Sequence, residues 1–95
     1  AVCWNDLTAI GLMNGISRAG LVPGEDISVT GYDDLEEAAI ATPALTTVWN
    51  GQREVGRRAA RALLDQLNGV EVSSNQELIK PELHIRQSTS KPKHA

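Results

Sequence analysis

Two polar side chains that follow apolar runs are the residues best placed to bind a small molecule. Asn5 follows residues 1–4 (AVCW), and Asp33 follows the β-prone residues 27–32 (ISVTGY). An amide side chain both donates and accepts hydrogen bonds, whereas a carboxylate accepts them from hydroxyl or imino groups. The combination suits a polyhydroxylated or purine-like ligand.

The same side chains have a purely structural interpretation. Asn5 and Asp6 directly precede a helical pattern at residues 7–19, and the acidic pair 33–34 precedes a shorter one at residues 35–41. Side-chain oxygens at such positions cap helices by accepting hydrogen bonds from free backbone N–H groups of the first turn. Residue type and spacing leave ligand binding and helix capping both open.

A third strand candidate, residues 45–49 (LTTVW), brings Trp49 and Asn50 to a comparable position. An aromatic ring there could stack on a sugar or base. A partly buried hinge residue is the interpretation that the pattern favours for Trp49. Trp4 lies inside an apolar run and is predicted to belong to the core.

The elements that would position these residues alternate between strand and helix, which favours an α/β fold with a largely parallel sheet flanked by helices. In such a sheet Asn5 and Asp33 emerge at the same edge, where open α/β folds bind ligands. Arginines on the last long helix are predicted to form a solvated face. The expected order is β-α-β-(short α)-β-α-β-β, with strands 1–4, 27–32, 45–49, 77–80 and 82–87, and helices 7–19, 35–41 and about 52–68.

Composition narrows the classes of function. With 95 residues and a net charge of −3, the chain forms one small domain or a piece of a larger one. Cys3 is the only cysteine and the two histidines are isolated, so we predict no disulfide, metal site or cofactor. No phosphate-binding loop or catalytic motif is present, so no catalytic residue is predicted. The apolar runs are too short to span a membrane.

Several ordered segments resemble the lactose-repressor/galactose-repressor (LacI/GalR) family of bacterial transcription regulators. Residues 5–11 (NDLTAIG) resemble its ND-x-x-A-x-G signature, and residues 20–34 (GLVPGEDISVTGYDD) resemble its segment ending in G-[FY]-D-D. Further resemblances lie in residues 42–48 (TPALTTV), residues 56–64 (GRRAARALL) and residues 81–89 (PELHIRQST). Together they cover nearly the whole chain in the correct order.

The resemblance implies a periplasmic-binding-protein-like fold with two lobes, of which residues 1–89 are the C-terminal portion. Residues 1–48 would belong to the second lobe, residues 49–75 to a crossover and a first-lobe helix, and residues 76–89 to returning strands. Residues 90–95 are expected to be a frayed tail. The family's DNA-binding headpiece has no counterpart in this sequence, which also lacks a starting Met, so we expect a fragment of a longer cytoplasmic protein.

The resemblance also implies roles for particular residues. Asn5 and Asp33 match positions that commonly bind a sugar or nucleobase-like effector, and Asn50 and, less directly, Trp49 match the lobe crossover near it. The family often carries Gln at the Asn50 position. The full protein is expected to be a homodimer, and the positions matching its subunit contact are Ile10, Asn14, Leu35, Ala38 and Ala41.

Two other classes of protein share the expected fold. One is a periplasmic-type sugar-binding protein with the same lobes, and the other is an α/β enzyme. The segments 31–34 (GYDD), 42–48 and 86–89 (RQST) favour the regulator. A helix-turn-helix in the upstream sequence would support the regulator, whereas a secretory signal would support the sugar-binding protein.

Overall fold

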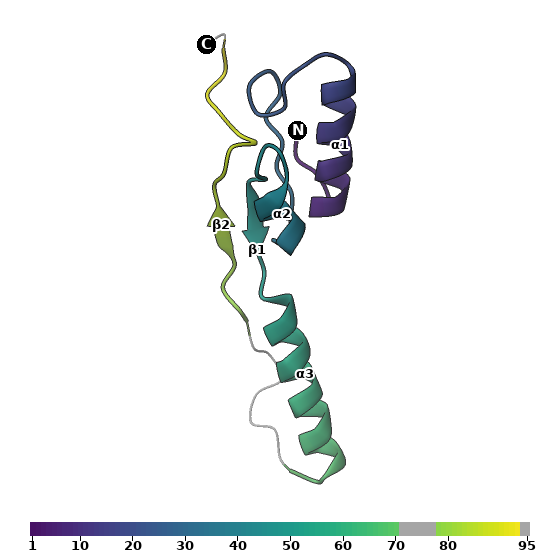
Figure 1. Ribbon diagram of the computed structural model, residues 1–95. Helices are drawn as coiled ribbons and strands as arrows, with labels where there is room; N and C mark the ends of the chain where they lie inside the picture. Colours follow the sequence, from purple (N-terminus) through teal and green to yellow (C-terminus); the bar gives the residue numbers. More distant parts are fainter. Residues whose placement is uncertain (71–77, 94–95) are drawn as a thin grey trace.

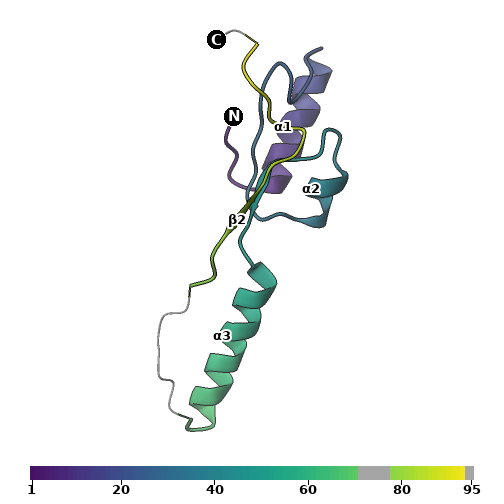
Figure 2. The ribbon, with the colours of Figure 1, turned by 90° about the vertical axis from the view of Figure 1, so that its left-hand side faces the viewer.

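A computed structural model describes residues 1–70 and 78–93, and these residues form three helices and two short strands. The α/β alternation predicted from the sequence is present. The helix α3 projects away from the other elements, which gather near both chain ends (Figures 1 and 2). The elements are α1 (Asp6–Arg18), α2 (Glu36–Ile40), β1 (Thr47–Trp49), α3 (Gln52–Leu67) and β2 (Glu82–His84).

The predicted strands at residues 1–4 and 27–32 are shorter than expected. Instead of continuous strand pairing, they form isolated parallel bridges, from Val2 to Thr30 and from Thr30 to Thr46. Backbone hydrogen bonds nevertheless hold these segments side by side, as in the bond of 2.9 Å from Cys3 N to Thr30 O. The three extended segments therefore run parallel, as the sequence predicted.

The strand β2 adds an antiparallel neighbour to these parallel segments, because it pairs antiparallel with β1. The strand β2 returns alongside β1 (Figure 1). Val48 lies opposite Leu83 in this pair. The sheet is mixed because the chain leaves β1, forms α3 and comes back in the opposite direction. The further strand predicted at residues 77–80 is not formed by residues 78–80, and Glu77 lies outside the described residues.

The core lies between α1 and the extended segments. Ala9, Met13 and Ile16 are spaced so that they share one face of α1, and all three are buried. They pack with Val29 and Leu45 from the extended segments, both fully buried, and with a buried alanine of α2. Small and aliphatic side chains form this core because the sequence has no Phe.

The helix starts differ from the predicted ones. Asn5, rather than Asp6, is the N-cap of α1, and its Oδ1 accepts a hydrogen bond of 2.8 Å from Thr8 N. Neither acid of the pair 33–34 caps the second helix, because its cap residue is Leu35 and no side chain caps it. The carboxylates of Asp6 and Asp34 are thereby available for other contacts.

Residues 86–89, part of the closing motif of the sequence, tie the end of the chain to the sheet. The Arg86 guanidinium donates to the Asp34 carboxylate at 2.9 Å. The buried Ser88 hydroxyl donates to Val29 O at 2.6 Å and accepts from Thr46 N at 2.8 Å. Arg86 and Ser88, two positions apart, thus contact different segments of the chain.

The expected fraying of residues 90–95 does not hold for two of them. Ser90 N donates to the Ser28 hydroxyl at 3.1 Å, and the Lys93 ammonium lies 2.7 Å from the Asp26 carboxylate. The hydrogen bond from Lys93 is the main cause that lowers the pKa of Asp26 from its ordinary value of 3.8. The start of the tail is therefore attached to the loop that precedes the second extended segment.

The helix α3 carries an apolar stripe, but none of its residues is buried within the described chain. The side chains of Val55, Leu63, Leu64 and Leu67 are between 49% and 73% exposed. Burying such a stripe is the usual source of stability for an amphipathic helix. Residues 1–70 and 78–93 therefore provide no surface that buries this stripe.

Glu54 is expected to titrate far below the ordinary range. Hydrogen bonds from Arg57, and then from Arg58, lower the pKa of Glu54 from 4.5 to about 2. Its stabilising effect is thus fully present above about pH 4.5 and is lost as the pH falls through about 2. A carboxyl-carbon NMR titration should give a midpoint near this lower value. In Arg57→Ala the midpoint should rise, and a wild-type midpoint at 4.5 would contradict the ion pair.

Candidate functional site

The ends of the three parallel segments meet at one edge of the sheet. Asp6 N donates to Tyr32 O at 3.1 Å, and Asp33 N donates to Val48 O at 2.9 Å. Asp33 also forms a parallel bridge with Trp49. The sequence-predicted residues at positions 5, 33, 49 and 50 therefore lie on neighbouring chain segments, as the parallel order requires.

Asp33 is the charged group at this edge. Its Oδ1 accepts two side-chain hydrogen bonds, from Asn50 Nδ2 at 3.0 Å and from Gln52 Nε2 at 2.8 Å. Its φ of 121° is unusual for a residue with a side chain. Backbone conformations of this kind cost about 1–3 kcal/mol and cluster at functional sites. Asp33 is thus held in a defined orientation at some cost in backbone energy.

The adjacent carboxylate, Asp34, serves the structure rather than this edge. Its Oδ1 binds Arg86 at 2.9 Å and its Oδ2 lies 3.2 Å from His84 Nδ1. Its φ of 58° is also positive, so the chain turns sharply between the two acids. The turn sends the neighbouring carboxylates to different partners, and only Asp33 stays at the strand edge.

Asn50 and Trp49 follow the third segment. The amide of Asn50 donates to Asp33, whereas its Oδ1 is buried and has no partner among the described residues. Trp49 is half-buried, and its ring lies against Gly51, where an added Cβ would stand 3.2 Å from Cη2. That contact favours the hinge interpretation of Trp49 over ring stacking on a ligand.

Trp4 was predicted to belong to the core, and this prediction is wrong. The side chain is 88% exposed, because alternation along the extended segment turns Cys3 toward the core and Trp4 to the opposite face. Together with Tyr32 and Asp33 it lines a small open hollow. The sequence pattern did not single out this ring, although its position directly before Asn5 places it at the same strand end.

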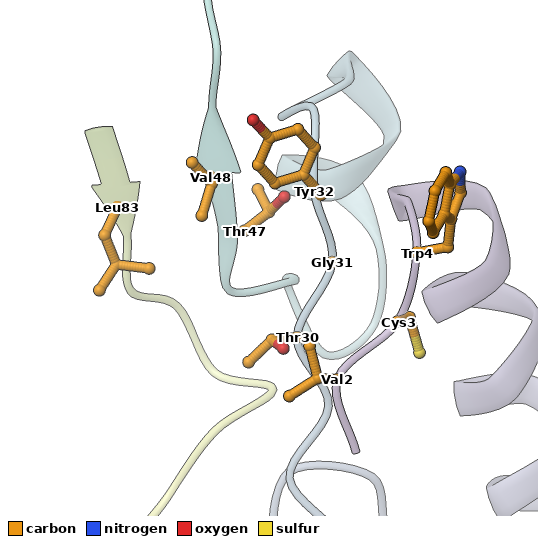
Figure 3. A pocket seen from close by; sticks show the side chains of 9 residues that line it. All are labelled: Val2, Cys3, Trp4, Thr30, Gly31, Tyr32, Thr47, Val48 and Leu83. Carbon is orange, nitrogen blue, oxygen red and sulfur yellow. The ribbon is translucent and has the colours of Figure 1, made fainter. Parts of the chain in front are cut away.

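A larger hollow lies on the same face of the sheet and carries no charged side chain (Figure 3). Its polar side-chain groups are uncharged, namely three hydroxyls, the Trp4 indole N–H and the Cys3 thiol, and most of its lining is apolar. Such a face suits packing against another apolar surface better than binding of a polar ligand. It is lined by Val2, Cys3, Trp4, Thr30, Gly31, Tyr32, Thr47, Val48 and Leu83.

Asp6, which the sequence pattern offered only as a helix cap, has a structural role below this edge. It is fully buried, and its Oδ1 accepts from the Thr47 hydroxyl at 2.5 Å while its Oδ2 accepts from Leu35 N at 2.7 Å. Gly31 passes so closely that an added Cβ would stand 3.2 Å from Asp6 Cα and 2.9 Å from Leu45 Cδ2. Asp6 thus joins the start of α1 to β1 and to the segment before α2.

The positions expected at a subunit contact differ in their exposure. Asn14 is exposed, and Ile10, Leu35 and Ala41 are half-buried, so each retains surface that a second chain could contact. Ala38 is fully buried in the core of this chain. Its place in the predicted interface is therefore corrected, since packing between α1 and α2 already uses its methyl group.

Within residues 1–70 and 78–93 no group of three or more His, Cys, Asp or Glu side chains is placed to hold a metal ion. In the same part of the chain, no helix is long and apolar enough to cross a membrane.

The chain belongs to the family described as the periplasmic binding protein-like domain, whose model matches residues 1–89. Among curated proteins it is similar to the HTH-type transcriptional repressor PurR of Vibrio vulnificus (strain CMCP6), with 39% identity over 89 residues. It is equally similar to the HTH-type transcriptional repressor CytR of Escherichia coli (strain K12), with 39% identity over 87 residues. The predicted resemblance to the LacI family is confirmed.

The matches cover most of this chain but only part of each relative. They include 94% of the chain and 27% of PurR, and 92% of the chain and 26% of CytR. The chain therefore spans about a quarter of the length of these repressors.

Solved structures agree with the sequence matches. A dimeric lac repressor with an 11-residue C-terminal deletion is similar at a TM-score of 0.85 and 38% identity, over 96% of this chain and 33% of that one. The transcription regulator CcpA of Lactococcus lactis is similar at a TM-score of 0.87 and 27% identity, over 95% of this chain and 33% of that one. The predicted fold class is thereby confirmed.

Proposed function

We propose that this chain is the effector-binding and dimerisation part of a DNA-binding transcription regulator, and that a small polyhydroxylated or purine-like effector binds beside Asp33. The observation that carries the proposal is the oriented carboxylate of Asp33 at the shared edge of three strand ends. The similarity to repressors supports the regulatory role. The relatives are repressors, which favours binding over catalysis.

The chemistry of this edge suits such an effector. Asn50 and Gln52 occupy Oδ1 of Asp33, so Oδ2 is the atom that accepts from a ligand hydroxyl or imino group. The Oδ1 of Asn5 caps α1, so this residue contributes its N–H donors to the ligand. The exposed Trp4 and Tyr32 rings offer flat apolar surface for a sugar or base.

The regulatory mechanism rests on two lobes. In this proposal residues 1–48 belong to the second lobe, residues 49–75 cross to the first lobe, and residues 76–89 return. Residues 71–77 of this division lie outside the described residues. The projecting α3, with its exposed apolar stripe, supports its packing against a first lobe (Figure 2). An effector that binds one arrangement of the lobes more tightly shifts the protein toward that arrangement. DNA affinity then changes by the coupling free energy between the effector site and the DNA site. DNA binding itself would belong to a headpiece outside this chain.

The regulator would act in the cytoplasm, where operator DNA is found, and would be a homodimer. Contact through the exposed side of α1 and the flank of α2 is consistent with the surface left at Ile10, Asn14, Leu35 and Ala41. A similar solved structure is described as a dimeric lac repressor. The alternative of a periplasmic-type sugar-binding protein shares the fold, and the repressor relatives disfavour it.

The test uses the intact protein that contains this chain. Genomic DNA fragments that it retains are selected, and affinity for the best fragment is measured by fluorescence anisotropy. D-galactose, D-ribose, o-nitrophenyl galactoside, hypoxanthine and cytidine are then added separately. We expect at least one of them to change DNA affinity by about tenfold, a typical coupling. The absence of sequence-specific DNA binding, or DNA affinity that none of the five compounds changes, would overturn the proposal.

A further inference from the structure

The side chain of Gln52 contacts the cleft carboxylate although neither the residue pattern nor the family resemblance singled it out. Its Nε2 donates to Asp33 Oδ1 at 2.8 Å, which is shorter than the 3.0 Å bond from Asn50. Gln52 is the first residue of α3. This hydrogen bond therefore links the carboxylate of Asp33 at the strand edge to the first residue of α3.

The backbone around Gly51 explains how two amides reach one oxygen. Gly51 has a φ of 66°, a left-handed conformation that residues with side chains rarely adopt. An added Cβ would stand 3.0 Å from Ile79 Cγ2 and 3.2 Å from Trp49 Cη2. The turn brings residues 50 and 52 to the same side of the chain, facing Asp33.

We propose that Gln52 is a positioning residue of the effector site: with Asn50 it occupies Oδ1 of Asp33 and leaves Oδ2 to accept a hydrogen bond from the effector. This inference rests on the proposed function. The two donors on Oδ1 orient the carboxylate of Asp33. The positive φ of Asp33 sets the direction in which its side chain leaves the backbone. The site therefore selects ligands that present a hydroxyl or N–H donor, and disfavours those that present an acceptor there.

The substitution Gln52→Leu removes the donor and keeps a side chain of similar size. Loss of one hydrogen bond to a charged group should weaken effector binding by about tenfold. Gln66→Leu is the matched control, because Gln66 is exposed about four turns further along the same helix. Its affinity should equal that of the wild type.

The substitution Gln52→Glu gives a result that loss of packing would not produce. A protonated carboxyl at position 52 can donate to Asp33 as the amide does, whereas an ionised one repels it. Effector affinity of Gln52→Glu should therefore fall as the pH rises from about 5 to about 8, because like charges at hydrogen-bond distance disfavour joint ionisation. Gln52→Leu should lack this dependence.

Calorimetry on the intact regulator uses the five probes named above, with Asp33→Ala as the reference for the site. Loss of binding in Asp33→Ala with unchanged affinity in Gln52→Leu would overturn the role of Gln52 and leave the proposed function standing. A Gln52→Glu variant without the pH dependence would also overturn it. Unchanged affinity in Asp33→Ala, or binding of none of the probes, would overturn the proposed function and this inference together.

Discussion

Replacement of Asp33 with alanine in the intact regulator should weaken effector binding by about a hundredfold while DNA affinity without effector is retained. A hydrogen bond to a charged group contributes about 1.5–3 kcal/mol, and its removal also leaves the amides of Asn50 and Gln52 without their acceptor. The side chain is only half-buried and lies outside the hydrophobic core, so folding should be little affected. Calorimetry with the probe that alters DNA binding measures the loss.

Two further variants test whether the effector site requires the Asp33 carboxylate itself. One keeps the size of the side chain and the other removes a carboxylate elsewhere. Asp33→Asn can keep an oxygen toward Asn50 and Gln52 but presents N–H donors to the effector, so it should lose binding almost as completely. Glu25→Ala removes an exposed loop carboxylate and should bind as the wild type does. If Asp33→Ala retained wild-type affinity, the carboxylate would not belong to the effector site.

Replacement of Asp6 with alanine should destabilise the protein by about 3–5 kcal/mol, since it removes two hydrogen bonds to a charged and fully buried group. The Thr47 hydroxyl and Leu35 N would lose their acceptor in a site that water does not reach easily. Urea denaturation followed by circular dichroism gives the change in the free energy of unfolding. A decrease below about 1 kcal/mol would show that these contacts are replaceable.

Asp6→Asn is the matched control for this loss. Its oxygen can accept from Leu35 N, while its amide donates to Thr47 Oγ1, because a hydroxyl can also accept a hydrogen bond. Both contacts survive without the charge, so the destabilisation should be clearly smaller than in Asp6→Ala. Equal losses in the two variants would indicate that the negative charge itself, rather than hydrogen-bond satisfaction, is required.

Periodicity and turn residues predicted the helices closely. The pattern at residues 52–68 became α3 at Gln52–Leu67, and the pattern at residues 7–19 became α1 at Asp6–Arg18. Helical spacing and glycine stops are local signals, which is why they can be read without tertiary contacts. Strand extent was predicted less well at residues 1–4 and 27–32, since regular pairing depends on neighbours that the local pattern does not contain.

The sequence alone determined the class of fold, the family and the placement of Asn5 and Asp33 at strand ends, because these follow from residue order and spacing. Only the tertiary structure decided what each neighbouring acid does. Asp6 is buried beneath Thr47, and Asp34 pairs with Arg86, a partner 52 positions away in the sequence. The donation from Gln52 to Asp33 likewise depends on a left-handed turn at Gly51. The hydrogen-bond partners of these polar side chains come from segments that are distant in the sequence. Local residue patterns therefore cannot predict which partner each side chain has.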